Sequence, residues 1–499
     1  MEIKVIVDDI TKIKTDAIMV SFFEGTKSPD GDTALIDKAL DGAISQLIDH
    51  GEIKGKLNEV TLIHSLGRLP VSHVVITGLG KKSELTPNKI RGAVAETCRW
   101  LQRKNLKNLA SVAHGAGIRK ISPDDAAQAV TEGALLGLYS FRKHITKKNH
   151  KPGEIKQLLI ISNNEAKSQL ANGSRKGKII AGATNLARDM VNEPANYMTP
   201  GDMAKTAIKL ADDYGLEVSV LEQEQMRELG MRALLGVAQG SRQPPKLIIL
   251  HYKGADTAEA AISLAGKGVT FDSGGISIKP SDKMEEMKGD MAGGAAVIAA
   301  MSAIAQLKPR INVTAIIPAT ENLPDGNALK PGDVLTAMSG KTIEIISTDA
   351  EGRLILADAL SYIKKLGAKR IIDVATLTGS CRVALGDICT GAFSNNQELA
   401  NKVIAAGNEA GELIWPMPMF DEYAEQNKSN VADIKNVGGR LAGAITAAKF
   451  LAEFVDKTPW VHLDIAGTSL TEKEQGYQVK GATGVPVRTL VNLVLSLVK

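Results

Sequence analysis

Apolar runs of two lengths alternate along the first third of the chain and predict strands separated by helices. Short runs rich in Val, Ile and Leu predict strands at Ile3–Val7, Ala17–Phe22, Val60–His64, His73–Thr77, Leu109–Ala113 and Leu158–Ile161. Longer runs predict helices near Thr33–Asp49, Asn88–Arg103 and Pro123–Leu138. This alternation indicates an α/β domain with a mostly parallel sheet.

A long helical pattern from residue 163 to residue 192 predicts a helix that links this domain to a second one. Beyond it we expect strands at Leu216–Leu221, Lys246–Tyr252, Ala261–Ala265, Asn312–Ile317, Thr342–Ile346, Arg370–Ala375, Ile388–Phe393 and Val461–Ile465. Helical patterns separate most of these strands, so we expect a three-layer α/β/α domain with a central mixed sheet. The predicted division is 1–162 for the N-terminal domain, 163–192 for the linking helix and 193–499 for the C-terminal domain.

The charge of the chain is nearly balanced. It has 60 basic and 56 acidic side chains among 499 residues, a net charge of +4, which gives no electrostatic case for nucleic acid as a partner. The basic segment Arg142–Lys151 offers nucleic-acid contact as one interpretation. It contains no Phe, Tyr or Trp on which a base can stack, so a solvated connection is favoured.

Cysteine usage and hydropathy indicate where the chain works. Cys98, Cys381 and Cys389 form no Cys-x-x-Cys pair, which favours free thiols and a reducing compartment. No basic segment followed by a long apolar one opens the chain, so no signal peptide is expected. The longest apolar run, Ala292–Leu307, is interrupted by polar residues and falls short of the roughly 18 residues that a membrane span needs. We expect a buried helix there, no membrane segment and a cytoplasmic protein.

Charged side chains gather where two apolar runs end in turns. Lys267, Asp272, Lys279 and Asp290 follow the run Ala261–Ala265. Asp349, Glu351 and Arg353 follow the run Thr342–Ile346. Asp349 and Glu351 lie two residues apart, so in an extended chain both point to the same side. The carboxyl ends of strands collect ligands in open α/β sheets, so we expect the two groups to converge.

Four of these side chains are carboxylates, which suit two divalent cations. Hard cations prefer oxygen ligands, and two of them can share a bridging water. Lys267 can join only as a neutral amine, a state that a neighbouring dication can enforce. All eight histidines lie outside residues 252–461, so a His-built zinc site is not favoured, and Mn, Zn, Mg or Co all suit the oxygen donors. Lys279 and Arg353 remain as positive charges for an oxyanion or a bound anion such as bicarbonate.

Three motifs carry a resemblance to a known family. The string Ser347-Thr-Asp-Ala-Glu-Gly-Arg-Leu354 resembles the signature octapeptide of the leucyl aminopeptidase family of metallopeptidases, which usually begins with Asn. The segments 266–281 and 192–200 are similar to the same family at the expected spacing. The resemblance spans roughly residues 165–499 and is looser in the amino-terminal third, where it implies a macro-like fold.

The resemblance implies a role for each metal-site residue. Lys267 and Asp290 would bind the tighter metal ion, Asp272 and Glu351 would bridge both ions, and Asp349 would complete the more exchangeable site. Lys279 would polarise the scissile carbonyl group, and Arg353 would hold a bicarbonate that acts as general base.

The resemblance also implies a pocket for the first side chain of the substrate. Its walls would be Met287, Thr376, Gly379 and Ala466. Gly289 stands where a bulkier residue is common, and Ser347 stands where Asn is usual. Neither position is a metal ligand in the family. The two departures therefore bear on which first residue is preferred and not on the type of reaction.

The implied function is that of a metal-dependent aminopeptidase, assembled as a homohexamer, that releases leucine-like N-terminal residues from peptides with two divalent ions per subunit. Two other hypotheses stand beside it. The first is a nucleic-acid-binding or regulatory role on the N-terminal domain or across an oligomer, which resemblance to some bacterial members of the family implies and the near-neutral charge does not favour. The second is binding of a ligand such as ADP-ribose, without catalysis, by the macro-like domain. Gly78-Leu-Gly80 and His114–Gly117 follow strands but complete no dinucleotide fingerprint, so tight turns are favoured there.

Overall fold

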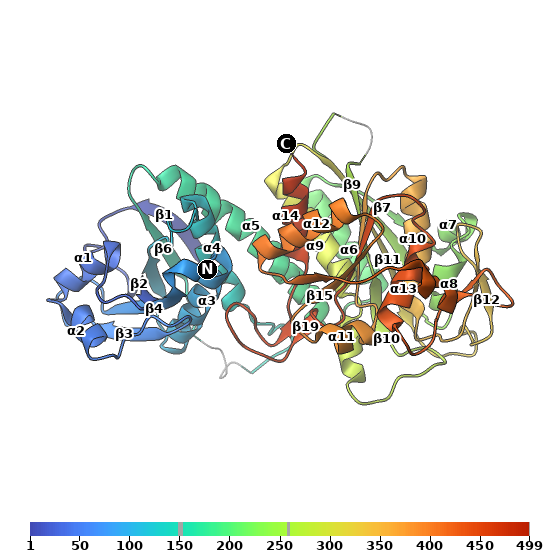
Figure 1. Cartoon of the computed structure of the whole chain (residues 1–499), viewed down its shortest axis with the longest axis horizontal. Helices are drawn as coiled ribbons and strands as arrows, with labels where there is room; N and C mark the ends of the chain where they lie inside the picture. The colour runs from blue at the N-terminus through green and yellow to red at the C-terminus, as the bar shows by residue number, and fades with distance from the viewer. Residues whose placement is uncertain (148–152, 257–259, 499) are drawn as a thin grey trace. The chain divides into compact units, whose positions relative to one another are not determined.

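The computed structural model describes residues 1–147, 153–256 and 260–498 and divides into two compact units (Figure 1). The first unit comprises Met1–Gly182 and Glu472–Lys480, and the second comprises Ala183–Thr471 and Gly481–Lys499. Helix α5 (Lys167–Asn192) runs from one unit into the other. The last part of the basic segment predicted as a solvated connection, residues 148–151, lies outside the described residues.

The first unit is built on a six-stranded sheet. Its strands run in the order β1 (Glu2–Val7), β6 (Gln157–Ser162), β5 (Asn108–Ser111), β2 (Ala17–Glu24), β4 (His73–Lys81) and β3 (Val60–His64). All neighbours are parallel except β3 and β4. The prediction of a mostly parallel sheet is confirmed. The helices are α1 (Gly31–Ala39), α2 (Ala43–Asp49), α3 (Pro87–Arg103) and α4 (Pro123–Gly137), with the short 3-10 helix η1 at Lys82–Glu84.

The single helix predicted near Thr33–Asp49 is wrong, because two helices occupy this stretch. Asp41 and Gly42 both have left-handed backbone, with φ of 55° and 81°, which ends the first helix and turns the chain. Asp37 stabilises the break, since its carboxylate accepts hydrogen bonds from the amides of Ile44 at 2.8 Å and Ser45 at 3.1 Å. These are amides at the start of α2 that have no partner within the helix.

The second unit has a nine-stranded mixed sheet. The strands run in the order β16 (Ile414–Pro416), β15 (Thr390–Ser394), β18 (Trp460–Asp464), β14 (Ile371–Ala375), β9 (Ile262–Gly266), β11 (Asn312–Asn322), β8 (Lys246–Lys253) and β7 (Glu217–Leu221). The ninth strand, β10 (Gly268–Asp272), pairs with the far end of β11. The centre of the sheet, from β18 to β11, is parallel, and its flanks include antiparallel pairs. The central mixed sheet is as predicted.

Helices cover both faces of this sheet and form the expected three layers (Figure 1). One face carries α6 (Pro200–Tyr214), α9 (Ala292–Leu307), α12 (Gln397–Ala410) and α14 (Val487–Ser496). The other carries α8 (Arg232–Ala238), α10 (Glu351–Lys365) and α13 (Gly443–Ala452). The unit also contains α7 (Gln223–Glu228), α11 (Gly379–Leu385) and the 3-10 helices η3 (Met284–Gly289) and η4 (Asp421–Asn427).

Helix α9 is the predicted buried helix. Among the described residues, the stretch Met284–Leu307 that contains it is the one helical segment long and apolar enough to cross a membrane, and 89% of its most apolar window is buried inside the structure. A helix that is apolar all round belongs in the interior of a large domain.

The strand predicted at Thr342–Ile346 does not belong to the central sheet. Its first part, β13 (Thr342–Glu344), pairs with β12 (Val334–Thr336) and β17 (Ile434–Lys435) in a separate three-stranded sheet. The amide of Ile346 donates to the side chain of Asn436 at 2.8 Å instead of to a neighbouring strand, so the ladder ends early. Strands too short for the sequence pattern to reveal are β12, β16, β17, β19 (Leu470–Thr471) and β20 (Gly481–Ala482).

Glycines let α9 approach the centre of the sheet closely. A methyl group on Gly293 would lie 2.1 Å from the carbonyl oxygen of Val374 on β14, and one on Gly266 would lie 2.6 Å from the carbonyl oxygen of Gly293. The amide of Gly294 then donates to the carbonyl of Lys267 at 2.7 Å. Only glycine permits this approach of helix to strand, and it fixes the backbone from which Lys267 extends.

We expect Gly293→Ala to destabilise the protein by about 1–3 kcal/mol, because the new methyl group must push α9 away from β14. Urea unfolding measures this loss. Gly182→Ala is the matched control, since Gly182 is an exposed helical glycine with open space around its Cα. That change should stabilise the protein by about 0.5–1 kcal/mol. Equal effects of the two substitutions would contradict the role given to Gly293.

Candidate active site

Lys267 is the single residue between β9 and β10. Strand β9 pairs with the first part of β11, and β10 pairs with its last part. Its amide donates to the carbonyl of Val374 at 3.0 Å, which holds its backbone to β14. Its side chain is only 3% exposed and its Nζ lies 2.8 Å from Asp290 Oδ2 and 2.7 Å from Glu351 Oε1. The same nitrogen donates to the carbonyl of Thr376 at 3.1 Å. The lysine thus joins three segments that are far apart in the sequence.

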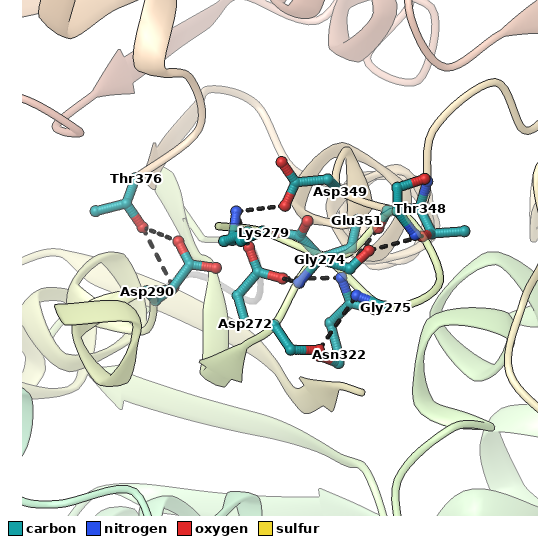
Figure 2. Close-up of polar contacts among 12 residues, drawn as sticks. Asp272, Gly274, Gly275, Lys279, Asp290, Asn322, Thr348, Asp349, Glu351 and Thr376 are labelled. Atoms are coloured by element: carbon teal, nitrogen blue, oxygen red, sulfur yellow. Dashed lines mark hydrogen bonds and ion pairs between the residues drawn. The ribbon is translucent and has the colours of Figure 1, made fainter. Parts of the chain in front are cut away.

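The carboxylates around Lys267 come from different elements. Asp290 directly follows η3 and lies two residues before α9, and its Oδ1 accepts a hydrogen bond from Thr376 Oγ1 at 2.7 Å. Glu351 is the first residue of α10. Asp349 lies in the turn before that helix, so the reasoning that placed Asp349 and Glu351 on one extended segment is wrong, although both side chains do face the site (Figure 2). The early start of α10 is the cause.

A second lysine lies closer to solvent. Asp272 ends β10, and its Oδ2 lies 2.8 Å from Lys279 Nζ, which also pairs with Asp349 (Figure 2). The side chains of Lys279 and Asp349 are 21% and 39% exposed, whereas that of Asp272 is 3% exposed. The site therefore has a buried end around Lys267 and an open end around Lys279.

All but one of the predicted site residues line one cavity of about 260 Å³. The cavity is bounded by Lys267, Asp272, Lys279, Asp290, Asp349 and Glu351, by the predicted pocket walls Met287, Thr376, Gly379 and Ala466, and by Gly289. The exception is Arg353, a buried residue on α10 whose guanidinium donates to the carbonyl of Asn436 at 2.6 Å. Its Nε is buried with no hydrogen-bond partner among the described residues.

The electrostatics of this cluster suit a positive ion. Burial raises the pKa of Asp272 to about 6, and the neighbouring Glu351 charge raises it too, against the lowering effect of the lysines. Burial also raises the pKa of Asp290 well above its usual range. Burial alone lowers the pKa of Lys267, but Asp290, Glu351 and Asp272 outweigh it and raise that pKa. The carboxylates are thus crowded and short of positive charge.

A divalent ion fits this donor set. Asp272, Asp290 and Glu351 each offer an oxygen within 4.8 Å of the others, and all three are buried. Glu351 Oε2 has no hydrogen-bond partner among the described residues, a costly state for a buried carboxylate oxygen that a bound cation relieves. Mn, Mg, Co and Zn ions all bind carboxylate oxygens arranged in this way.

Sequence reasoning missed the residues that hold the ligands in place. Asn322, at the end of β11, donates from Nδ2 to Asp272 Oδ1 at 2.8 Å and to the carbonyl of Thr348 at 3.0 Å (Figure 2). On the other side, Asn436 Nδ2 donates to the carbonyl of Ser347 at 2.7 Å. One signal was available, a polar residue soon after an apolar run, but the predicted strand stopped at Ile317.

Asp464 was missed in the same way. It is buried at the end of β18, and its carboxylate accepts from Thr378 Oγ1 at 2.7 Å and from the amides of Leu377 at 3.2 Å and Ala466 at 3.1 Å. Leu377, Thr378 and Ala466 all line the cavity. One carboxylate therefore ties together two walls of the predicted substrate pocket.

Comparison with known proteins agrees with this geometry. Residues 185–491 match the model of the cytosol aminopeptidase family, catalytic domain, and residues 19–148 match that of the N-terminal domain. The fold and the site thus define a metal-dependent hydrolase of two domains. The chain belongs to the cytosol aminopeptidase family, as the motifs predicted. Membership implies a metal-dependent enzyme that removes N-terminal residues.

Individual relatives match along the whole chain. A protein named "Probable cytosol aminopeptidase" from Alkaliphilus oremlandii (strain OhILAs) is 46% identical over 500 residues, and the alignment covers 100% of this chain and 100% of that protein. One of the same name from Aquifex aeolicus (strain VF5) is 43% identical, with 99% of this chain and 98% of that protein covered.

Two solved structures are similar to this one. A tomato leucine aminopeptidase mutant has a TM-score of 0.88 and 33% identity, with 99% of this chain and 96% of that chain covered. The bottromycin maturation enzyme BotP in complex with Mn has a TM-score of 0.85 and 34% identity, with 97% of this chain and 100% of that chain covered.

The raised pKa of Asp272 predicts how metal binding depends on pH. A carboxyl with a pKa of about 6 is ionised above that pH and protonated below it, and a metal ion binds only the ionised form. Protonation of Asp272 should therefore weaken the affinity for Mn²⁺ by a further factor of roughly ten per unit as the pH falls through about 6 to about 5, in addition to the dependence from the proton that Lys267 must release. Calorimetric titration measures it, with circular dichroism confirming the fold at each pH. An affinity that stays constant over this range would contradict the assignment of Asp272.

Proposed function

We propose that this protein is an aminopeptidase with two divalent metal ions per subunit that releases leucine-like N-terminal residues from peptides. One observation carries the proposal: five potential ligands, Lys267, Asp272, Asp290, Asp349 and Glu351, converge on a cavity that is also lined by the apolar side chains of Met287, Leu377, Ala466 and Leu470. Charge at one end and an apolar wall at the other suit a substrate with a free amine and an aliphatic first side chain.

The ligands divide by burial. Asp290 and Lys267 lie at the closed end and would hold the tighter ion, while Asp349, 39% exposed, would serve the more exchangeable one. Asp272, which pairs with Lys279, and Glu351, which pairs with Lys267, would bridge the two ions. When bound, the two metal ions would act as Lewis acids that activate water and the scissile carbonyl group. Lys267 can act as a ligand only after losing its proton, which the charge of a dication in contact with it enforces.

Two cations of the chain itself would act on the substrate. Lys279 lies at the open end, where its ammonium group can donate to the scissile carbonyl oxygen and stabilise negative charge that develops there. Arg353 would hold a bicarbonate that takes the proton of the attacking water. The buried Nε of Arg353 without a hydrogen-bond partner supports this role, since a guanidinium binds a planar anion through paired donors.

Mn is the first metal to test, because the similar BotP structure is in complex with Mn. Zn, Mg and Co suit the same donors. We further propose that the working form is a homohexamer in the cytoplasm, as the family resemblance implies. The substrates are peptides with a free N-terminus, and the near-neutral charge of +4 does not favour nucleic acid as a partner.

Glu351→Gln should bind less than the two Mn²⁺ ions per chain expected of the wild type, and its rate of leucine-amide hydrolysis should fall by about 10²-fold or more, since the amide carries no negative charge for the ions. Metal analysis after dialysis and a rate assay measure both. Glu412→Gln is the matched control, because Glu412 is also buried and paired with a cation, Arg488, but lies outside the cavity. Full metal content and activity in Glu351→Gln would refute the proposal.

The pocket walls predict a change in specificity. A side chain added at Gly379 meets open space and enters the cavity that Gly379 lines. Gly379→Leu should lower kcat/KM for leucine amide by about tenfold or more relative to alanine amide, since room for a single methylene group in an apolar pocket is worth about 1–3 kcal/mol of binding. Hydrolysis rates across a panel of amino-acid amides measure the ratio. An unchanged ratio would place the first side chain elsewhere.

A further inference from the structure

Asn322 occupies the point where the two ligand-bearing segments meet. It is the last residue of β11 and is only 4% exposed. Its carbonyl accepts hydrogen bonds from the amide of Ser273 at 3.0 Å and from Ser273 Oγ at 2.7 Å. The backbone of Asn322 is therefore fixed against the turn that directly follows Asp272.

The side chain of Asn322 spans the gap between those segments. A single nitrogen, Nδ2, donates to Asp272 Oδ1 at 2.8 Å and to the carbonyl of Thr348 at 3.0 Å (Figure 2). Asp272 lies 50 residues before Asn322, and Thr348 lies 26 residues after it, next to Asp349. One buried amide thus connects a proposed bridging ligand to the turn that carries Asp349 and leads into α10, whose first residue is Glu351.

The surrounding turn packs tightly against the side chain of Asn322. Gly275 has a φ of 66°, and a methyl group on it would lie 2.7 Å from Asn322 Oδ1 and 3.0 Å from Thr348 Oγ1. Thr348 Oγ1 donates to the carbonyl of Gly274 at 2.6 Å and accepts from the amide of Ser277 at 2.8 Å. Glycine at position 275 is thus required for Asn322 to fit between the two segments, and the Thr348 hydroxyl holds the 347–349 turn against the backbone of residues 274–277.

The two oxygens of Asp272 have different partners. Oδ1 accepts from Asn322 and from the amide of Gly274 at 2.9 Å, whereas Oδ2 faces the cavity beside Lys279. A neutral amide donor fixes the rotation of the carboxylate without a charge that would compete with a cation for it. Hydrogen bonds of this kind to a metal ligand are typically worth 10- to 100-fold in metal affinity or activity.

We propose that Asn322 is a positioning residue that sets the orientation of Asp272 and its separation from the 347–349 turn, so that two metal ions can share Asp272 as a ligand. The inference rests on the proposed function, because it needs two ions in the site. A merely structural role would lower stability when Asn322 is replaced but would leave the number and spacing of bound ions unchanged.

Asn322→Leu tests this proposal, since leucine has a similar shape and lacks both hydrogen-bond donors. Asn312→Leu is the matched control on the same strand. Asn312 is a buried asparagine at the opposite end of β11, where its Oδ1 accepts from the amide of Ala255 at 2.9 Å, and it lies outside the cavity. Both full-length variants are titrated with Mn²⁺ by calorimetry, and electron paramagnetic resonance reports whether the bound Mn²⁺ ions are magnetically coupled.

We expect Asn322→Leu to bind one of its two Mn²⁺ ions about 10- to 100-fold more weakly and to lose the coupled signal, with kcat lowered and KM little changed. Asn312→Leu should match it in lost thermal stability but should keep both ions, the coupled signal and the wild-type kcat. If Asn322→Leu does not fold, Asn322→Ser, whose hydroxyl cannot reach both acceptors, is tested in its place.

A folded Asn322 variant with two coupled Mn²⁺ ions of wild-type affinity would overturn the inference. That outcome is distinct from failure of the proposed function, in which the wild-type protein itself would bind no pair of ions or would hydrolyse no amino-acid amide. Equal loss of metal affinity in the Asn312 and Asn322 variants would also overturn the inference, because it would assign the effect to the stability of β11.

Discussion

The contact on which the site depends is the burial of Lys267 against Asp290 and Glu351. Its Nζ lies 2.8 Å and 2.7 Å from the two carboxylates, and all three side chains are at most 8% exposed. Removing such charges from water costs several kcal/mol each, a cost that their mutual attraction offsets only in good geometry. A chain that served stability alone would place apolar side chains there. The cluster is therefore explained by binding a cation rather than by folding.

Much of the second unit holds that geometry in place. Glycines at positions 266 and 293 bring α9 against the strands, so that the backbone of Lys267 is bonded to both α9 and β14. Asn322 and Asn436 hold the 347–349 turn from two sides. Asp464 does the same for the pocket walls. Buried polar side chains whose hydrogen bonds reach the ligand turns and the pocket walls give a rigid site whose ligands need little rearrangement on binding.

Site residues could be predicted from the sequence where a charged side chain lies at the end of an apolar strand. Lys267 and Asp272 could be placed because apolar runs end in glycine beside them, and the α/β/α class followed from the alternation of strands and helices. Asn322, Asn436 and Asp464, which hold the ligand turns and pocket walls, could not be predicted in this way. Their role depends on contacts between segments that are distant in the sequence. Asn322 lies five positions after Ile317, because the apolar pattern of β11 fades over Pro318-Ala-Thr-Glu321 although the strand continues to Asn322. The break at Gly42 was missed because the side chain of Asp37, seven residues before Ile44, replaces helix hydrogen bonds. The end of β13 was missed because the side chain of Asn436, 90 residues after Ile346, replaces a ladder hydrogen bond.

The most direct measurement is anomalous X-ray scattering from crystals grown with Mn²⁺. Two peaks are expected, one within coordination distance of Lys267 and Asp290 and one near Asp349, with Asp272 and Glu351 reaching both. Data that instead kept the Lys267 ammonium paired with Asp290 and Glu351, with no manganese between them, would contradict the claim that this charge cluster exists to bind metal.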